Sequence, residues 1–214
     1  MRITKIESQK RHPDRKSIYA DGEFVAGVSA ETLLKLALRT GDELSDAQLE
    51  VLKKTEALAG AKNAALRFLG GRMRTVREVR DKLREKEYAD GEIAATISEL
   101  RGAGLLDDAA FARVYIRNAL TLHPSGPALL KRKLLLLGVE KSLIDSALAE
   151  ELGAETAASA ATDLARTFVR KARTSRKTET PEKLRQRLSA FLARRGFGWD
   201  VIKEAAATAL GKDE

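Results

Sequence analysis

Three segments of fifteen residues decide the predicted fold: LREKEYADGEIAATI at 83–97, LLLLGVEKSLIDSAL at 134–148 and LARRGFGWDVIKEAA at 192–206. In each segment, apolar positions are separated by steps of five, five and four residues. These positions are Leu83, Tyr88, Ile93 and Ile97, then Leu134, Val139, Ile144 and Leu148, then Leu192, Phe197, Ile202 and Ala206. A pattern that recurs in this way indicates tandem copies of one supersecondary unit.

A further helical apolar pattern precedes each segment, at 64–68, 112–116 and 161–168, so the repeating unit is predicted to contain three helices. The start signals of the second helix agree with this prediction: Thr75 with Glu78 forms a capping box, Ser125 precedes Gly126-Pro127, and Thr180 precedes Pro181. Gly138 and Gly196 stand at matching places where two helices meet at a sharp angle, and Glu87 takes that place in the first copy.

The first 60 residues differ from the repeats. Asp21-Gly22 separates two apolar runs and predicts a β-hairpin with a type I′ turn. Ser29 is expected to cap a short helix that runs to about Leu38 and exits at Gly41. Ser45 with Gln48 predicts a capping box at the start of a second helix, in which Gly60 is a candidate interruption.

The predicted fold class is therefore mainly α. It comprises three tandem three-helix repeats that form an elongated array, with a small N-terminal β-hairpin segment. The expected segments are 1–60 for the hairpin and its helices, then 61–108, 109–153 and 154–214 for the repeats. The alternative is one compact helical domain in which the spacing is a coincidence.

Composition excludes several classes of protein. The chain of 214 residues has no Cys, which removes disulfides, thiol catalysis and cysteine metal sites. Neither a signal peptide nor an apolar run long enough for a membrane span is recognisable, so a reducing cytoplasm is the expected location.

No catalytic, metal-binding or cofactor-binding residue is predicted. Asp107-Asp108 precedes an apolar helix and is interpreted as a helix cap. His12 and His123 lack the spacing of metal ligands, and Gly70-Gly71 lacks the Lys-Ser/Thr that completes a phosphate-binding loop.

Basic residues supply the candidate binding sites. The chain carries a net charge of +8, and its cations gather in three clusters: Arg72, Arg74, Arg77 and Arg80; Lys131, Arg132 and Lys133; and Arg166, Arg170, Lys171, Arg173, Arg176 and Lys177. Such clusters suit DNA phosphates or acidic protein grooves, the alternative being ordinary solvated helix faces. Base-specific readout is not expected, because no helix carries the set of Asn, Gln and Arg residues that reads base edges. Stacking on single strands would need exposed aromatic residues, but most of these residues fall at core spacing. Trp199 is expected to pack between helices, the alternative being contact with a partner.

The residues from Arg72 to Leu83, followed by Leu100, Gly104-Leu105-Leu106-Asp107-Asp108, Phe111-Ala112, Tyr115, Gly126-Pro127 and Arg195-Gly196-Phe197, resemble the signature of the RecX regulatory proteins. The resemblance covers residues 61–210, and Asp21-Gly22-Glu23-Phe24 fits the extended front of some members. Three features depart from the family pattern: Gly70-Gly71, Glu87 in place of Gly, and residues 166–179, which are expected to lengthen a loop.

The resemblance implies a cytoplasmic, non-enzymatic regulator of the RecA recombinase that takes part in DNA recombination, repair and the SOS response. Members bind the RecA–DNA filament along its helical groove and suppress ATP hydrolysis, strand exchange and filament growth. The expected partners are therefore the RecA filament and single- or double-stranded DNA without sequence specificity, bound by a monomer that needs no cofactor. Two alternatives stay open: a general DNA-binding module that competes for DNA, and a helical scaffold for an unrelated acidic protein.

Overall fold

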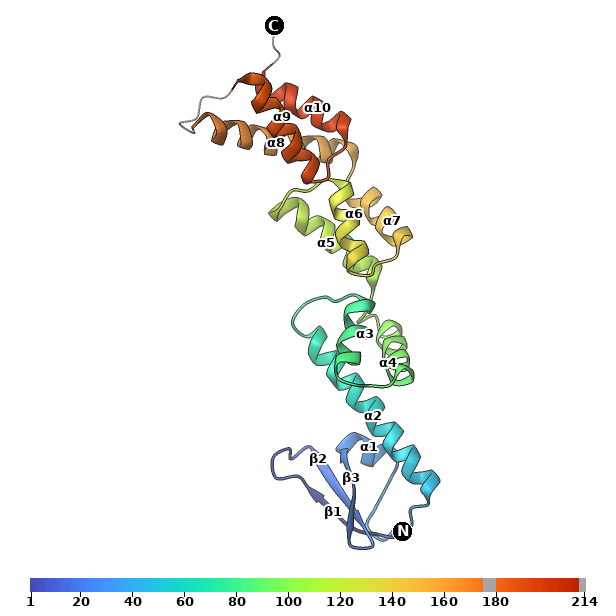
Figure 1. The fold of residues 1–214 in the computed structure, drawn as a ribbon. Helices are drawn as coiled ribbons and strands as arrows, with labels where there is room; N and C mark the ends of the chain where they lie inside the picture. The colour runs from blue at the N-terminus through green and yellow to red at the C-terminus, as the bar shows by residue number, and fades with distance from the viewer. Residues whose placement is uncertain (175–179, 212–214) are drawn as a thin grey trace. The chain divides into compact units, whose positions relative to one another are not determined.

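The computed structural model describes residues 1–174 and 180–211, which are mainly helical with one small sheet at the N-terminus (Figure 1). The predicted fold class, a helical repeat protein with a short β segment, is confirmed in these elements. Contacts between residues divide the chain into two compact units, Met1–Met73 with Val79–Leu106, and Arg74–Glu78 with Asp107–Glu214. The four segments proposed from the sequence stay a prediction.

The N-terminal sheet is antiparallel with strand order β1-β2-β3, where β1 is Ile3–Ser8, β2 is Arg15–Ala20 and β3 is Glu23–Ser29. Asp21 and Gly22 connect β2 to β3 with φ values of 50° and 90°, as a type I′ turn requires, so the predicted hairpin is confirmed. The structure adds β1 as a third strand beside β2. The apolar face packs around a buried cluster of Ile3, Ile18, Val28, Leu44 and Leu52.

The short helix α1, Ala30–Lys35, starts where the sequence predicted, because the Ser29 side chain accepts a hydrogen bond from the Thr32 amide. It ends at Lys35, so the predicted extension to Leu38 is wrong. The reason is local: Ala37 adopts a φ of 51°, in the left-handed region that ends a helix.

The long helix α2, Asp46–Leu69, begins with the predicted capping box between Ser45 and Gln48. It continues through Gly60, so the candidate interruption there is wrong. Gly60 is instead a point of close approach, because a Cβ atom at this position would lie 3.0 Å from the hydroxyl oxygen of Tyr88.

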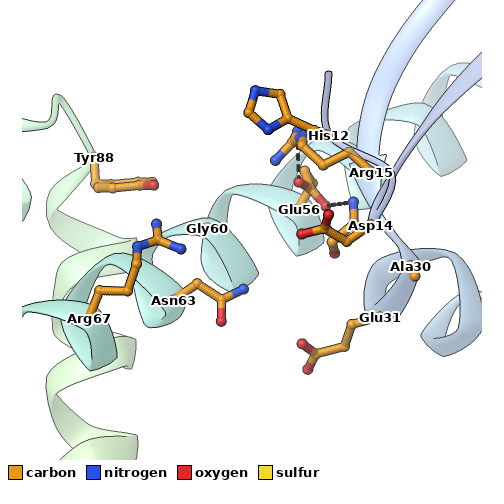
Figure 2. Close-up of a pocket in the computed structure, with 11 residues that line it drawn as sticks. His12, Asp14, Arg15, Ala30, Glu31, Glu56, Gly60, Asn63, Arg67 and Tyr88 are labelled. Carbon is orange, nitrogen blue, oxygen red and sulfur yellow. Dashed lines mark hydrogen bonds and ion pairs between the residues drawn. The ribbon is translucent and has the colours of Figure 1, made fainter. Parts of the chain in front are cut away.

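Glu56 joins α2 to the sheet (Figure 2). Its carboxylate accepts hydrogen bonds from the Ser29 amide at 2.8 Å and the Ser29 hydroxyl at 3.1 Å, and it pairs with the Arg15 guanidinium at 3.0 Å. The same side chain therefore holds the N-terminal cap of α1 and the first residue of β2.

The first repeat continues with α3, Val76–Glu85, and α4, Asp90–Gly102. Thr75 and Glu78 form the predicted capping box: the Thr75 amide donates to Glu78 at 3.0 Å, and the Glu78 amide donates to the Thr75 hydroxyl at 3.2 Å. The recurring apolar positions do form the interior. All twelve are buried except Tyr88 and Leu148, which are half-buried.

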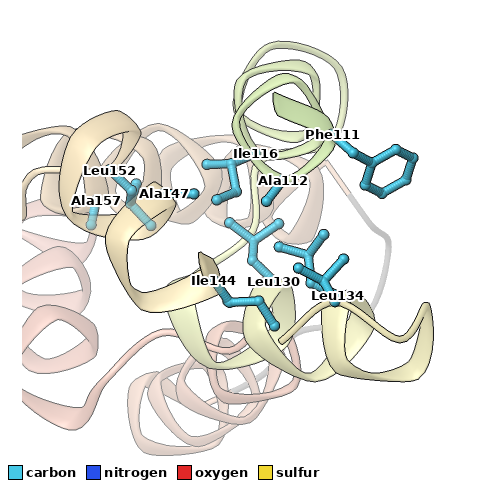
Figure 3. Close-up of a cluster of buried hydrophobic side chains, with 10 residues drawn as sticks. Phe111, Ala112, Ile116, Leu130, Leu134, Ile144, Ala147, Leu152 and Ala157 are labelled. Atoms are coloured by element: carbon cyan, nitrogen blue, oxygen red, sulfur yellow. The ribbon is translucent and has the colours of Figure 1, made fainter. Parts of the chain in front are cut away.

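The second repeat consists of α5, Asp108–Leu122, α6, Pro127–Leu136, and α7, Lys141–Glu151. Its core is closed by Ala157 at the start of the next helix (Figure 3); the buried members are Phe111, Ala112, Ile116, Leu130, Leu134, Val139, Ile144, Ala147, Leu152 and Ala157. Arg117 on α5 donates to both carboxylate oxygens of Glu151 on α7, at 3.1 and 2.6 Å, which lowers the pKa of that carboxyl group.

Ser125 does not cap α6. Its hydroxyl donates to the His123 carbonyl, and Gly126 is the N-cap residue.

The third repeat consists of α8, Ala154–Arg173, α9, Pro181–Arg194, and α10, Trp199–Leu210. Thr180 caps α9 as predicted, by accepting from the Lys183 amide. Residues 166–173 were expected in a lengthened loop, but they are the last turns of α8, because Ala161, Ala165 and Val169 give this helix a buried stripe at helical spacing.

The aromatic residues are less buried than their spacing suggests. Phe111 and Phe197 are buried, whereas Phe68, Tyr88, Tyr115, Phe168 and Phe191 are half-buried. Trp199 is 69% exposed, so the expectation that it packs between helices is wrong. It is the first residue of α10, ahead of the buried position Ile202.

In the second unit, two turns that contain a left-handed glycine are hydrogen-bonded to the N-terminus of another helix. At the α9–α10 turn, where Gly196 has a φ of +84°, the Gly126 amide donates to the Arg195 carbonyl at 2.8 Å and the Ala128 amide donates to the Gly196 carbonyl at 3.2 Å. At the α6–α7 turn, where Gly138 also has a φ of +84°, the Thr75 hydroxyl donates to the Leu137 carbonyl at 2.7 Å. A helix N-terminus leaves backbone amides unpaired, and these turns supply acceptors near them.

The replacement Gly196→Ala is expected to lower the free energy of unfolding by about 2–4 kcal/mol and the melting temperature by roughly 5–10 °C. A left-handed residue with a side chain costs about 1–2 kcal/mol. In addition, the new Cβ atom would lie 2.3 Å from the Leu129 amide nitrogen, so two backbone segments would have to separate. Thermal denaturation followed by circular dichroism measures the change.

Gly104→Ala is the matched control, because Gly104 has a φ of +69° but no atom within 4 Å of the added Cβ. Its cost is expected to be the left-handed penalty alone. Equal losses in the two variants would contradict the close approach at Gly196.

Candidate nucleic-acid interface

The helix pair α8 and α9 carries eight cationic side chains, four on each helix. The rings of Phe168 on α8 and Phe191 on α9 stack with their centroids 5.0 Å apart, which aligns the two helices. No acidic residue occurs in the stretches 164–174 and 183–195. Within these two stretches, the cations therefore have no acidic neighbour in the sequence.

Five side chains define what we call the α8–α9 basic surface. All are exposed and have no hydrogen-bonding or ion-pair partner for their charged group within residues 1–174 and 180–211: Arg170, Lys171, Arg173, Lys183 and Arg194. Cations of this kind are available to an external anion, since no internal carboxylate must be displaced first. Three of them also lie in the last turn of α8, where positive charge favours the negative end of the helix dipole.

Other cations of the pair are used internally. Arg166 pairs with Asp163 at 3.8 Å. The Arg187 guanidinium lies over the Phe168 ring at 5.7 Å, and that of Arg195 lies over Phe191 at 5.3 Å while donating to the Pro124 carbonyl. These residues extend the positive potential of the surface but also hold the fold together.

Only part of the predicted cluster at 166–177 is exposed and without an ion pair in the described residues. Arg170, Lys171 and Arg173 are exposed as a binding role requires, and Arg166 is engaged by Asp163. Arg176 and Lys177 lie outside the described residues. Sequence reasoning missed Lys183 and Arg194, although their separation of eleven residues, or three helical turns, places them on one face of α9.

Residues of the predicted cluster around α3 make contacts within the chain. Arg72 donates to the neighbouring Met73 carbonyl, and the half-buried Arg74 pairs with Glu78 at 3.5 Å. Arg77 lies against the α6–α7 turn, because a Cβ atom at Gly138 would be 2.5 Å from its own Cβ. Arg80 borders a cavity of about 410 Å³ that Asp90 and Arg101 also line.

The three residues of the predicted cluster on α6 lie in different surroundings. Lys131 is half-buried and pairs with Asp145 on α7, while Arg132 and Lys133 are exposed.

The acidic residues singled out in the sequence serve as helix caps. Asp107 accepts from the Ala109 and Ala110 amides at the start of α5, as predicted. Asp108 accepts from the Val76 amide at 2.9 Å, so it caps α3 instead. Across residues 1–174 and 180–211, no group of three or more His, Cys, Asp or Glu side chains is placed to hold a metal ion.

Both positively and negatively charged side chains line the cavity of about 560 Å³ in the first unit (Figure 2). Arg15 and Glu56 in its wall are paired with each other, and Ser29 is hydrogen-bonded to Glu56. His12, Asp14 and Glu31 lie on the sheet side, and Asn63, Arg67 and Tyr88 on the helical side. Its central polar groups are thus used to join α2 to the sheet.

In the part of the chain that the structure describes, no helix combines the length and apolar character needed to cross a bilayer.

The fold and this surface define a class: tandem three-helix repeat proteins that carry an N-terminal sheet and an exposed basic helix pair. Family models identify the class more closely. They match the RecX N-terminal domain at residues 1–45 and the first, second and third RecX three-helix domains at 61–100, 107–148 and 161–206. The chain belongs to the RecX family of regulatory proteins.

Similarity to individual RecX proteins supports this family assignment. The regulatory protein RecX of Clostridium botulinum (strain Eklund 17B / Type B) is 30% identical over 210 residues, covering 98% of this chain and 96% of the relative. That of Bacillus subtilis (strain 168) is 33% identical over 203 residues, covering 95% of this chain and 75% of the relative. The relative from Lactobacillus delbrueckii is 38% identical over 148 residues, and the match spans 54% of its length.

Solved structures show the same fold. A crystal structure of regulatory protein RecX is 29% identical with a TM-score of 0.78, over 95% of this chain and 98% of that one. The structure of RecX from Lactobacillus salivarius, at 23% identity and a TM-score of 0.65, matches 72% of this chain and 96% of that one in fold.

Charge reversal of Arg170, Lys171 and Arg173 to Glu is expected to weaken binding to single-stranded DNA by at least tenfold at low salt. It should also flatten the dependence of log K on log salt by about 2, since each phosphate contact on a single strand contributes about 0.7. Fluorescence anisotropy with a labelled oligonucleotide at several salt concentrations measures both.

The control is Lys35→Glu with Arg39→Glu and Lys54→Glu, which changes the net charge equally at three exposed positions of the first unit. Similar losses in both variants would mean that net charge alone drives binding and that the α8–α9 basic surface has no special role.

Proposed function

We propose that this protein is a non-enzymatic negative regulator of the RecA recombinase. It binds the RecA–DNA filament along its helical groove and inhibits ATP hydrolysis, strand exchange and filament extension. Membership of the RecX family is the observation that carries the proposal, together with the match over all three repeats. The same membership supports a role in the cytoplasm, in DNA recombination, repair and the SOS response.

The basic helix pair supports a mechanism of electrostatic attachment. A nucleoprotein filament is a polyanion, and unpaired Arg and Lys side chains raise the rate of encounter with it and can contact phosphate or carboxylate groups. The repeats supply further exposed surface, so that a bound molecule contacts more than one recombinase subunit. It acts as a monomer, without cofactor or metal, by holding subunits in a state that hydrolyses ATP slowly.

The α8–α9 basic surface also favours a second candidate, a sequence-non-specific DNA-binding module that competes for DNA. This candidate needs no contact with the recombinase. Its affinity would depend steeply on salt and would be saturated by free DNA, whereas binding to the filament should survive competition by free DNA.

Titration of preformed RecA filaments on single-stranded DNA, with ATP hydrolysis as the readout, separates the two candidates. A regulator that acts on the filament is expected to lower hydrolysis at amounts far below those that coat the DNA. If hydrolysis falls only when the DNA is saturated, the competition mechanism takes its place.

The Arg170, Lys171 and Arg173 reversal variant belongs in the same titration. We expect it to require at least several-fold more protein for half-inhibition, with the control at Lys35, Arg39 and Lys54 close to the natural chain. Unchanged inhibition by a folded reversal variant would exclude this surface from the filament contact.

A further inference from the structure

The indole of Trp199 is a large apolar group that the fold leaves in solvent. It is 69% exposed at the first position of α10. The helix is capped at this end by Gly198, which contributes no side-chain hydrogen bond. An exposed aromatic ring of this size offers apolar area that is stabilised when another molecule buries it.

The repeat pattern shows that the fold does not need an aromatic residue here. The equivalent first positions of the third helix are Asp90 in the first repeat and Lys141 in the second, and both are exposed and charged. A solvated charge therefore satisfies this position in two of the three copies. Trp199 is consequently not explained by the packing that the three repeats share.

Two exposed cations lie close to Trp199 in the sequence. Arg194 ends α9 just before the turn to α10, and Lys203 lies one turn after Trp199 on the same face of α10. Both are exposed, and within the described residues neither has an ion-pair partner, although Asp200 is adjacent in sequence. Along α9, Arg194 lies about 16 Å from Lys183 at a rise of 1.5 Å per residue. The cations of the α8–α9 basic surface therefore extend to the end of α9 that precedes Trp199.

We propose that Trp199 is a stacking platform for a base of single-stranded DNA, placed at the end of the α8–α9 basic surface. This inference rests on the proposed function, because it names a contact that the surface makes with the nucleic acid. Phosphates follow the cations of α9, and one base stacks on the indole. Every base has a π face, so such contact adds affinity without sequence specificity.

Single strands are favoured over a protein pocket as the occupant because of the flanking cations. A hydrophobic pocket on a protein would have to bury Arg194 and Lys203 beside the indole, and buried charges are costly unless they are paired. A nucleotide presents an aromatic face and a phosphate together, which matches an exposed indole that follows a row of cations in the sequence. Paired duplex DNA offers no free base face, so duplex binding should not use Trp199.

The chain contains one Trp, so its intrinsic emission reports on position 199 alone. Adding an oligothymidine is expected to quench this emission, whereas duplex DNA should leave it nearly unchanged. Trp199→Ala is expected to weaken binding to the oligothymidine by roughly 5- to 100-fold, the range of one lost base–aromatic stack, and to leave duplex affinity within about twofold. Trp199→Phe should recover most of the loss.

Phe24→Ala is the matched control, since Phe24 is an aromatic residue 60% exposed on the N-terminal sheet, outside the proposed surface. It should bind the oligothymidine like the natural chain. Circular dichroism shows whether the Trp199→Ala variant is folded, and Trp199→Phe provides the same test if it is not.

Equal oligothymidine affinity of the natural chain and folded Trp199→Ala would overturn the stacking contact while leaving the regulator function intact. Loss of filament inhibition without loss of oligothymidine affinity would also overturn it, and would assign the indole to a protein contact. Failure of the natural chain to inhibit ATP hydrolysis would contradict the proposed function separately, whatever the behaviour of Trp199.

Discussion

The second unit depends on the pairing of helix N-termini with left-handed turns. A helix begins with amides that have no partner inside the helix, and burying them without an acceptor would be costly. The α9–α10 turn offers the carbonyls of Arg195 and Gly196 to the start of α6, and the α6–α7 turn offers the carbonyl of Leu137 to Thr75 at the start of α3. Each contact therefore satisfies hydrogen bonds and fixes the distance between the start of a helix and a turn that lies far away in the sequence.

Glycine is required in these two turns for two separate reasons. The backbone has a φ of +84° at both Gly138 and Gly196, and a neighbouring segment occupies the space that a side chain would fill. Glu87 has a similar φ of 63° in the first repeat, but its side chain is exposed. The family departure at Glu87 is thus tolerated, because an exposed side chain adds no clash to the cost of the left-handed backbone.

The same construction explains where the functional chemistry can lie. Side chains near the turns and caps are used for assembly: Arg77 packs on Gly138, Asp108 caps α3, and Arg195 reaches the Pro124 carbonyl. The five side chains of the α8–α9 basic surface are not used in this way. Within the described residues, Arg170, Lys171, Arg173, Lys183 and Arg194 have no ion-pair partner, which leaves them available to other molecules.

The sequence by itself determined the repeat, the hairpin and most helix caps, because these features depend on residues close together in the chain. Apolar steps of five, five and four residues reflect one buried face, and the capping box at Thr75 involves side chains three residues apart. Only the tertiary structure decided which cations are available and where Trp199 lies. Arg74, Lys131 and Lys183 look alike in sequence, yet the first two meet carboxylates of Glu78 and Asp145 and the third meets none within the described residues. Exposure and ion pairing depend on which helices pack together, and that arrangement is not contained in the spacing of any single helix.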